Sequence, residues 1–468
     1  MVCRICDQIG LRSFRYVPFA YYVKGDPYAK GLSKEEFELL LRCDGNQELK
    51  EEPLLAELLE RGLAEPCKKG TPVSQWSGLH TYRNRYFPKM NLMITGKCNY
   101  NCLHCFNAAD NAPILDEWNY EELCHLLDEA RDCGIHAFTI TGGEPMLYPH
   151  FVDVLRQITA RGMFVEELNT NGYFITQDIL DEMKGIGCMP LVKISFDGLG
   201  VHDWIRQRAG AEKKTFDAIH LCVENGFSVM AQTQVNQKTY PVLLATLEEL
   251  DRCGVQNTRL IRTTETHRWV ENAGDATISL PDYYEKMLSL VAGYTSKPHT
   301  MDLDVWLFMR LFSKEKAYKM SPIMCLEGEY KESAPVCKGN RGMVGVTSKG
   351  DVVPCLQMSG YMEEHHIRLG NLHEQSLESL LTSGDYYDVV CCTRKKLKEE
   401  NGECAACPYF EICCGGCRAL GVLYSRKEWN VFGTDHAKCL FFKEGWYGKI
   451  TETLSEWENL TEIQNLKI

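Results

Sequence analysis

The chain has 468 residues, of which 44% are hydrophobic and 25% charged, a composition typical of a globular protein with about three domains. No apolar stretch approaches the length of a membrane span, and the N-terminus lacks a secretory signal, which predicts a cytoplasmic protein that does not bind membranes. The formal net charge of −13 argues against a nucleic-acid partner, because phosphate binding needs a basic surface. The 23 cysteines indicate metal binding or catalysis rather than disulfides in such a compartment.

The N-terminal region, residues 1–80, has the pattern of a small α+β module. Two helix-like runs, 32–42 and 51–63, lie on either side of a Cys-Asp-Gly turn. Ser33 or Asp44 is a candidate helix N-cap. Together these features predict a module of the winged-helix type.

The middle of the chain, residues 88–300, follows a predicted linker at 72–85 and alternates between strand-like and helix-like runs. The strand-like runs are 90–95, 136–141, 164–170, 191–195, 227–235 and 258–262. The amphipathic runs between them end in glycine, as helices commonly do. Six strand–helix units in series predict an α/β fold, a partial (β/α)6 barrel of the TIM type, with its site at the carboxyl ends of the strands.

The C-terminal part differs in composition from the barrel. After a bridging segment, 301–335, the region 336–440 is rich in cysteine and glycine and has few long periodic runs. Such a composition predicts a domain organised around metal rather than around a large apolar core. Residues 441–468 are predicted to form a helix and a tail.

A cysteine motif, CNYNCLHC, stands just past the first predicted strand and contains Cys98, Cys102 and Cys105. Three thiolates on one tight loop can hold three irons of a four-iron cluster and leave the fourth iron open for a chelating ligand. The second predicted strand ends in TGGEP, residues 141–145. Its paired glycines allow a close backbone approach, and Glu144 can anchor the loop or accept a hydrogen bond from an ammonium. A zinc knuckle and an ordinary turn are the plainer alternatives.

CNYNCLHC followed by TGGEP resembles the radical S-adenosylmethionine (SAM) superfamily, over residues 88–300. The resemblance implies that SAM chelates the open iron of a cluster held by the three cysteines. The residues implied to contact SAM are Gly142, Gly143, Glu144, Pro145, Thr170, Asn171, Ser195 and Arg206. The plainer roles are turn chemistry for Asn171, a strand-end hydroxyl for Ser195 and a surface ion pair for Arg206. His104 stands where many members have an aromatic residue before the third cysteine.

A second series of cysteines surrounds the segment CAACPYFEICCGGC. The series resembles the SPASM extension of peptide- and protein-modifying radical SAM enzymes, which implies two auxiliary four-iron clusters and three clusters in all. The ligands implied for the first are Cys337, Cys355 and Cys417, with Cys325 as the candidate fourth. The ligands implied for the second are Cys404, Cys407, Cys413 and Cys439. A zinc ribbon is the alternative, and Cys414, Cys391 and Cys392 are interpreted as ordinary buried thiols.

The N-terminal module resembles the peptide-recognition element typified by the small chaperone of pyrroloquinoline quinone synthesis. Such modules bind a leader peptide by adding it as a strand to an exposed sheet edge. The alternative is a degenerate structural cap. Cys3 and Cys6 form a lone CxxC, for which we expect neither a metal nor a redox role.

These resemblances together imply an enzyme that cleaves SAM to a 5′-deoxyadenosyl radical and oxidatively modifies a ribosomally made precursor peptide with a leader. A thioether crosslink is the leading product, and carbon–carbon crosslinking and epimerisation are alternatives. Ferredoxin or flavodoxin is the implied electron donor. The main rival is a sulfatase-type formylglycine maturase, in which an aspartate follows the cysteine that matches Cys355; here that residue is Leu356. A non-catalytic metal-binding scaffold is a second rival, and it would not cleave SAM.

Overall fold

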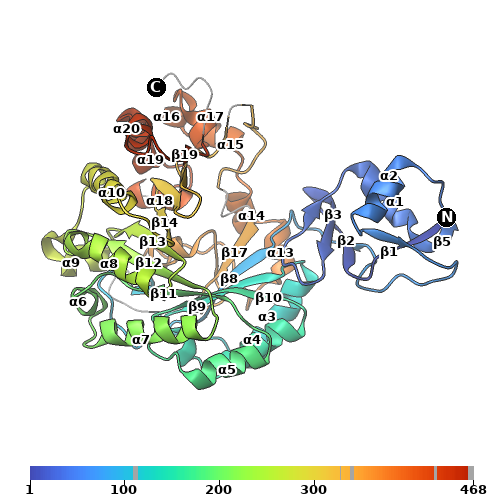
Figure 1. Ribbon diagram of the computed structural model, residues 1–468, viewed down its shortest axis with the longest axis horizontal. Coiled ribbons are helices and arrows are strands. Elements are labelled where there is room, and N and C mark those ends of the chain that lie inside the picture. The colour runs from blue at the N-terminus through green and yellow to red at the C-terminus, as the bar shows by residue number, and fades with distance from the viewer. Residues whose placement is uncertain (109–113, 327, 338–341, 426–428, 462–468) are drawn as a thin grey trace.

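The computed structural model describes residues 1–108, 114–326, 328–337, 342–425 and 429–461. A small N-terminal module stands to one side of a larger body that combines an α/β barrel with the C-terminal cysteine-rich region (Figure 1). Within the described ranges, no helix is long and apolar enough to cross a membrane.

The N-terminal module contains two small sheets and two helices. Its elements are β1 (Val2–Ile5), β2 (Ile9–Phe14), β3 (Val17–Val23), β4 (Lys30–Gly31), α1 (Lys34–Arg42), β5 (Asp44–Glu48), α2 (Pro53–Glu60), β6 (Ala64–Pro66) and β7 (His80–Thr81). The first sheet has the order β5-β1-β6 and the second the order β4-β3-β2-β7. Leu40 of α1 and Leu58 of α2 are fully buried in the core of the first sheet. The winged-helix assignment of this module stays a prediction.

Both predicted N-terminal helices are present, and their ends differ from the expectation in one respect. Ser33 caps α1 and forms a capping box with Glu36. Asp44 caps no helix, so that expectation is wrong. It begins β5, where its Oδ1 accepts hydrogen bonds from the backbone amides of Asn46 and Gln47 at 2.7 and 3.0 Å. An aspartate makes such a local turn as readily as a helix cap.

The segment predicted as a linker instead packs the module against the barrel. β7 pairs with β2 in the second sheet, and the buried Asn84 donates from Nδ2 to the carbonyl of Cys133 at 2.8 Å. The hydroxyl of Tyr28 donates to the Glu166 carboxylate at 2.5 and 2.6 Å. The hydroxyl of Tyr22 donates to a backbone carbonyl of the barrel, that of Gly134, at 3.5 Å. Aromatic and polar contacts therefore hold the module against the barrel.

The barrel consists of parallel strands with helices between them. Its strands are β8 (Lys89–Thr95), β9 (Ala137–Gly142), β10 (Phe164–Thr170), β11 (Leu191–Ser195), β12 (Val229–Val235), β13 (Asn257–Arg262) and β14 (Asp302–Val305). Its helices are α3 (Tyr120–Asp132), α4 (Phe151–Ala160), α5 (Gln177–Gly185), α6 (His202–Arg206), α7 (Ala211–Glu224), α8 (Tyr240–Arg252), α9 (His267–Asn272) and α10 (Leu280–Thr295), with short 3-10 turns η1 (Phe106–Ala108), η2 (Pro145–Leu147) and η3 (Gly274–Ala276). All six predicted strands are present close to their expected bounds.

The barrel sheet is open rather than closed. Its strand order is β18-β17-β8-β9-β10-β11-β12-β13-β14-β15-β16-β19, and its two ends do not pair within the described residues. The other strands of this sheet are β15 (Met309–Phe312), β16 (Ala317–Met320), β17 (Met343–Val346), β18 (Val352–Val353) and β19 (Glu458–Asn459). Of these, β17 continues the parallel series beside β8, whereas β15 and β18 pair antiparallel with their neighbours. The α/β partial TIM barrel predicted from the alternating pattern is therefore present.

The two faces of the sheet differ sharply in polarity. Val192 and Ile194 of β11 and Leu260 of β13 are buried in the core that the strands share with the helices. Because successive side chains alternate in a strand, Lys193 and Arg259 face the inside of the barrel. Near the amino ends of the strands, inward-facing charges neutralise each other: the ammonium nitrogens of Lys89 and Lys193 lie 2.9 and 2.7 Å from carboxylate oxygens of Glu167.

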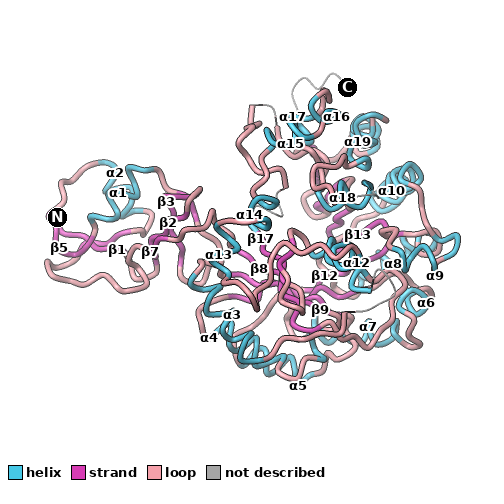
Figure 2. Tube along the Cα trace, turned by 180° about the vertical axis from the view of Figure 1, so that it is seen from behind, coloured by secondary structure: helices cyan, strands magenta, loops and turns pink. Residues whose placement is uncertain are grey.

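The C-terminal region is built from short helices joined by loops (Figure 2). Its helical elements are η4 (Leu356–Met358), α12 (Ser359–Glu364), α13 (Leu377–Thr382), α14 (Asp385–Val390), α15 (Arg394–Glu400), α16 (Gly402–Ala405), α17 (Phe410–Cys413), α18 (Arg418–Ser425), α19 (His436–Lys443) and α20 (Trp446–Thr453). The predicted helix after residue 441 is present as α20. The chain then returns to the barrel sheet, where β19 pairs with β16, and the last part of the predicted tail, 462–468, lies outside the described residues.

Candidate functional site

The loop with Cys98, Cys102 and Cys105 directly follows β8, at the carboxyl ends of the barrel strands. Burial, together with Cys102 and Cys105 nearby, raises the pKa of the Cys98 thiol to about 12. Burial and the neighbouring Cys102 raise the pKa of Cys105 to about 11. The three thiols therefore lie close enough to repel one another once ionised, and a bound cationic centre would relieve that repulsion.

Two arginines from later helices hold the cysteine loop in place. Arg268 of α9 donates from Nε to the carbonyl of Cys102 at 2.9 Å and from Nη2 to the carbonyl of Asn101 at 3.1 Å. Arg206 of α6 donates from Nη1 to the Sγ of Cys102 at 3.6 Å. Both arginines are buried, so the loop is fixed by groups that solvent does not screen.

Arg206 is itself anchored by a buried carboxylate. Its Nε and Nη2 donate to the two carboxylate oxygens of Asp197 at 2.6 and 3.2 Å, and Asp197 is fully buried. Burial alone would raise the pKa of Asp197, but the guanidinium of Arg206 and the neighbouring His202 together outweigh it and hold that pKa well below its usual range. The plainer role expected for Arg206 was an ion pair at the surface. The structure shows an ion pair, but it is buried. Its predicted contact with SAM stays a prediction.

The TGGEP turn packs against the start of the cysteine loop. A Cβ atom on Gly142 would lie 2.2 Å from the carbonyl oxygen of Thr95, and one on Gly143 would lie 2.3 Å from that of Lys97. The backbone amide of Glu144 donates to the carbonyl of Lys97 at 2.8 Å. The paired glycines were expected to let the backbone come close to a ligand. In the structure the backbone at the end of β8, at Thr95 and Lys97, comes close to them instead, so the two glycines set the position of the cysteine loop.

Glu144 ties the TGGEP turn to the end of β10. Its carboxylate is fully buried and accepts from the Thr170 hydroxyl at 2.9 and 3.0 Å, the Asn171 amide at 2.8 Å and the Met146 amide at 3.2 Å. Burial raises the pKa of Glu144 to about 7 in spite of these hydrogen bonds. Pro145, also buried, starts η2 immediately afterwards. Two roles were expected for Glu144, anchoring of the loop and acceptance of a hydrogen bond from an ammonium. Its contacts in the structure are those of a loop anchor.

Asn171 and Ser195 lie at the ends of neighbouring strands. The Asn171 side chain donates to the Asn99 side chain at 2.8 Å and lies 4.0 Å from the Sγ of Cys98. Its Oδ1 accepts from the Tyr173 amide at 2.9 Å, so it also performs the turn chemistry considered for it. Ser195 ends β11 and is half-buried, and its hydroxyl has no hydrogen-bond partner in the described part of the chain.

The cysteine loop also carries buried polar atoms that lack partners. Among the described residues, Asn99 Nδ2, Tyr100 Oη and His104 Nδ1 form no hydrogen bond. Leaving such an atom unpaired costs about 1–3 kcal/mol, so a polar group bound at this loop would offset a real cost. Three thiols, the guanidinium of Arg206 and these unpaired atoms fit an anionic iron–sulfur cluster with SAM beside it.

The predicted ligands of the first auxiliary cluster lie together. Burial, then the charges of Asp435, Cys337 and Cys355, raises the pKa of Cys417 to about 12. Burial and the neighbouring Cys337 likewise raise the pKa of Cys355, to about 11. The backbone amide of Cys417 donates to a carboxylate oxygen of Asp435 at 2.8 Å. That carboxylate fixes the turn just before α18, where Cys417 stands.

The four cysteines of the second predicted set are also gathered. Burial, with Cys413 and Cys407 close by, raises the pKa of Cys404 to about 11, although Arg418 opposes the rise. Burial and Cys413 raise the pKa of Cys439 to about 12. These electrostatic contributions link members within each predicted ligand set, but among the described residues no three side chains are arranged so that they could hold a metal ion. Cluster binding by these thiols stays a prediction.

Cys325, the candidate fourth ligand of the first auxiliary cluster, lies beside a cysteine that is outside the predicted ligand set. Its Sγ lies 3.2 Å from the Sγ of Cys414, and both thiols are buried. Cys414 has a positive φ of 54°, which ends α17. The sequence had interpreted Cys414 as an ordinary buried thiol, and in the described structure it is Cys414 that contacts Cys325.

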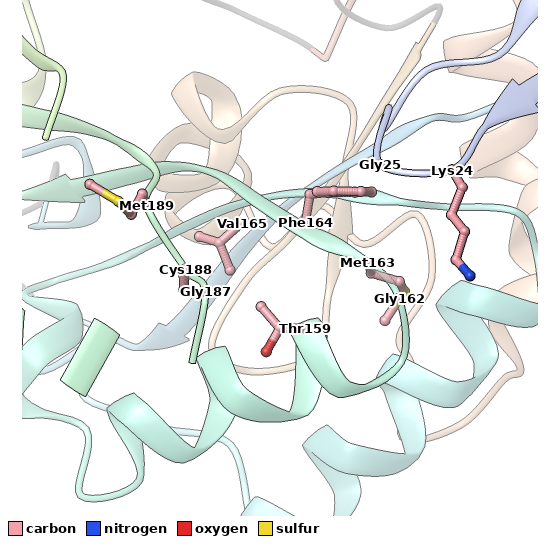
Figure 3. A pocket seen from close by; sticks show the side chains of 10 residues that line it. All are labelled: Lys24, Gly25, Thr159, Gly162, Met163, Phe164, Val165, Gly187, Cys188 and Met189. Carbon is pink, nitrogen blue, oxygen red and sulfur yellow. The ribbon is translucent and has the colours of Figure 1, made fainter. Parts of the chain in front are cut away.

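A pocket of about 410 Å³ lies between the N-terminal module and the barrel, far along the sheet from the cysteine loop. It is lined by Lys24 of the module and by Phe164 and Val165, which begin β10, whereas Thr170 at the other end of β10 contacts Glu144. Figure 3 shows the Lys24 side chain extending from the module beside the turn at Gly162. The pocket is therefore part of the junction between module and barrel and not of the cysteine site.

Two family models match the chain at these positions. The radical SAM superfamily matches residues 92–242, which include the three loop cysteines and all residues predicted to contact SAM. The SPASM iron–sulfur cluster-binding domain matches residues 337–408. The chain is a radical SAM enzyme with a SPASM domain. These two domains imply SAM and iron–sulfur clusters as its cofactors.

Proteins similar to this radical SAM enzyme differ in the molecules that their names mention. It is 26% identical over 334 residues to the AdoMet-dependent heme synthase of Methanosarcina barkeri, a match that covers 70% of this chain and 89% of the relative. Its fold resembles Streptococcus suis SuiB solved with the precursor peptide SuiA, with a TM-score of 0.64, 14% identity, and coverage of 94% of this chain and 100% of SuiB. It also resembles anSMEcpe solved with AdoMet and a peptide, with a TM-score of 0.54, 17% identity, and coverage of 79% and 99%.

The sequence did not predict the roles of Asp197 and Arg268, which support the cysteine loop. Asp197 lies two positions after Ser195 and nine before Arg206, and its pairing with that arginine could have been inferred from the acid–base combination alone. Arg268 carried no comparable signal, because its contacts are to the carbonyls of Asn101 and Cys102. Only folding brings α9 to the loop.

Proposed function

We propose that this radical SAM enzyme oxidatively modifies a ribosomally made precursor peptide, with a thioether crosslink as the leading product. Cys98, Cys102 and Cys105 would hold the SAM-binding cluster, and the two gathered cysteine sets would hold two auxiliary clusters. When bound, the cluster and SAM together supply a carbon radical able to remove a hydrogen atom from the substrate. Ferredoxin or flavodoxin would provide the electron.

The protein's own residues orient and shield this chemistry. Arg206, anchored by Asp197, would place Cys102 and partly balance the negative charge of the cluster. Glu144 would keep the TGGEP turn against β10, so that the SAM amino group meets a fixed surface. Ser195, whose hydroxyl is free within the described structure, is available for the SAM carboxylate or ribose. The barrel would exclude water from the reactive carbon.

The observation that carries the peptide assignment is the N-terminal module. It has its own buried core and is fixed to the barrel by the hydrogen bonds of Tyr28 to Glu166 and of Asn84 to Cys133. The likeness to SuiB extends over 94% of the chain, whereas the heme synthase relative aligns with 70%. A module held rigidly beside the catalytic domain suits the capture of a leader peptide at a sheet edge. This role for the module is part of the proposal.

A second candidate function, modification of a tetrapyrrole side chain, is favoured by the sequence relatives. The identity of 26% to an AdoMet-dependent heme synthase covers 89% of that protein. The formylglycine-maturase alternative finds less support, since Leu356, which begins η4 directly after Cys355, carries no group able to accept a proton.

Mass spectrometry of a co-expressed peptide tests the proposal. The substrate to supply is a short cysteine-containing peptide encoded beside the gene, and the expected result is a loss of two hydrogen atoms per crosslink. Iron-coproporphyrin supplied to the reconstituted enzyme is the matched alternative substrate. Porphyrin conversion with an unchanged peptide would replace the peptide assignment by the tetrapyrrole one.

A second arm tests the module. A variant that lacks residues 1–80 is unsuitable, because Asn84 and the second sheet would lose their packing. Adding the isolated leader segment as a competitor avoids this difficulty. We expect an excess of free leader to slow peptide modification without slowing SAM cleavage in the absence of peptide. Equal rates with and without the competitor would contradict leader binding.

A further inference from the structure

The inner face of the barrel carries a row of polar residues at one level of the sheet. Strand register aligns Ser195 of β11 with Gln232 of β12, Gln232 with Arg259 of β13, and Arg259 with Asp304 of β14. Their neighbours along each strand, such as Ile194 and Leu260, are buried against the helices, so all four row residues point into the barrel. The row begins at a residue predicted to contact SAM.

Arg259 is the unusual member of this row. Its Nε is buried and forms no hydrogen bond among the described residues; the same atom lies 3.4 Å from a carboxylate oxygen of Asp304, a long ion pair. Yet its side chain is 34% exposed and that of Asp304 is 30% exposed, although both lie on the inside of the barrel. The two charges therefore border an open, polar interior rather than packed side chains.

Other inward-facing groups leave polar atoms available to a polar molecule or to water in this interior. Asn91 of β8, Asn169 of β10 and Asn257 of β13 each have buried amide atoms with no partner in the described structure. Buried polar atoms are normally satisfied by protein, water or ligand, so these three amides can bind water or a polar ligand inside the barrel.

The other inward-facing cations of the barrel wall are already neutralised. Lys89 and Lys193 lie within 2.9 Å of the carboxylates of Glu166 or Glu167, and their side chains are only 15% exposed. Arg262, at the end of β13, has the strand parity of Leu260 and so lies on the opposite face from Arg259, where its Nε donates to the carbonyl of Ile278. Among these, Arg259 alone combines a weakly held charge with an open surface.

Arg259 also lies near the first auxiliary cysteine set. Burial raises the pKa of Cys355, and the backbone amide of Gln357 and, to a smaller extent, the positive charge of Arg259 oppose this rise. The row therefore extends from Ser195, on the side of the SAM site, to an arginine within electrostatic reach of Cys355. A substrate between the two sites would pass directly over Gln232 and Arg259.

We propose that Arg259, with Gln232 beside it, binds a carboxylate of the substrate inside the barrel and so positions the reacting carbon beside the SAM site, at the Ser195 end of the row. A guanidinium pairs with a carboxylate in bidentate geometry, which fixes direction as well as distance. Asp304 keeps the arginine oriented in the absence of substrate and yields to the incoming carboxylate. This inference deepens the proposed function and rests on it.

Chemical labelling of arginine tests the proposal on the reconstituted, SAM-bound protein. Phenylglyoxal modification of Arg259 is followed by peptide mass spectrometry, with succinate as the anionic probe and succinamide as its neutral counterpart at equal ionic strength. We expect succinate to slow labelling of Arg259 by about threefold or more and succinamide to leave it unchanged. Arg252, on the outside of the barrel with a 75% exposed side chain, is the matched control and should react equally in both solutions.

An Asp304→Asn variant distinguishes an Asp304 that competes with the substrate carboxylate from one that only supports the structure. Removing the carboxylate of Asp304 should lower the succinate concentration needed to protect Arg259 from labelling. If the ion pair were purely structural, its removal would instead weaken this protection. Equal protection by succinate and succinamide, no protection by either, or an unreactive Arg259 would each overturn the proposal. Repeating the protection with coproporphyrin and with the precursor peptide shows which carboxylate source binds more tightly. The proposed function is judged separately, by 5′-deoxyadenosine formation.

Discussion

Arg206 Nη1 lies 3.6 Å from the Sγ of Cys102, while the other nitrogens of its guanidinium pair with the buried carboxylate of Asp197. One side chain thus joins the cysteine loop after β8 to the segment after β11. The arrangement places a permanent positive charge beside a predicted cluster ligand and makes the position of that charge depend on a second, distant residue.

Replacing Arg206 by glutamine should destabilise the protein, because the Asp197 charge would remain buried without its partner. We expect the free energy of unfolding to fall by about 3–5 kcal/mol. Thermal unfolding of the iron-free protein measures the loss. Arg208→Gln is the control, since Arg208 is exposed and should cost less than about 0.5 kcal/mol. Asp197→Asn in the Arg206→Gln background should recover part of the stability, and an unchanged melting temperature in all variants would contradict the buried pair.

Replacing Gly143 by alanine should displace the cysteine loop. The added Cβ would lie 2.3 Å from the carbonyl of Lys97 and 2.4 Å from that of Gly96, and neither backbone atom can move without moving the loop. We expect less iron at the SAM-binding site after reconstitution and a weaker signal of the reduced cluster in electron paramagnetic resonance. Gly185→Ala, in α5 with open space around its Cβ position, should retain both. Normal iron loading of Gly143→Ala would refute the packing argument.

The buried Glu144 predicts a pH dependence of stability. Its folded-state pKa of about 7 lies above the ordinary value of 4.5, so the folded protein binds this proton more tightly than the unfolded chain. Stability from this group is full below about pH 4.5 and falls as pH rises towards 7, by up to about 3 kcal/mol. Glu144→Gln cannot ionise, so the difference in melting temperature between wild type and variant should change across that range. A constant difference would show that Glu144 titrates normally.

Iron content separates the two buried thiols Cys325 and Cys414 from the predicted cluster ligands. Because the Sγ atoms of these two residues contact each other at 3.2 Å, we expect Cys325→Ser to retain the iron content of the wild-type protein. Cys417→Ser should lose about four iron atoms per chain, since it removes a predicted ligand of the first auxiliary cluster. Loss of iron in Cys325→Ser equal to that in Cys417→Ser would make Cys325 the fourth ligand.

The barrel could be predicted from sequence because strand-like runs alternate regularly with amphipathic helical runs, a pattern that implies a parallel sheet covered by helices. β8 and β10 begin and end close to where the pattern placed them. The segment containing Trp76 and Asn84 was not predictable in the same way, since it packs through aromatic and polar contacts to distant parts of the chain. Likewise the end of the chain gave no sign that β19 would join the barrel sheet.

The candidate site likewise contains some residues whose roles could be predicted from sequence and others whose roles could not. Its cysteines stand in short motifs, whose chemistry is visible in the residues themselves. The role of Gly143 was only partly foreseen: the need for glycine was visible, but the backbone of Lys97, rather than a ligand, imposes it. Arg268 and Arg259 could not be found from sequence, because each acts across strands or helices that are distant along the chain.

The measurement that tests the central claim most directly is formation of 5′-deoxyadenosine by the reduced, iron-replete protein supplied with SAM under anaerobic conditions. We expect the wild-type protein to form it, and the single variants Cys98→Ala, Cys102→Ala and Cys105→Ala to form none. Cys124→Ala, which removes a thiol of α3 outside every predicted ligand set, should behave as wild type. Undiminished 5′-deoxyadenosine from any of the three loop variants, or none from the wild type even with its peptide, would contradict the account.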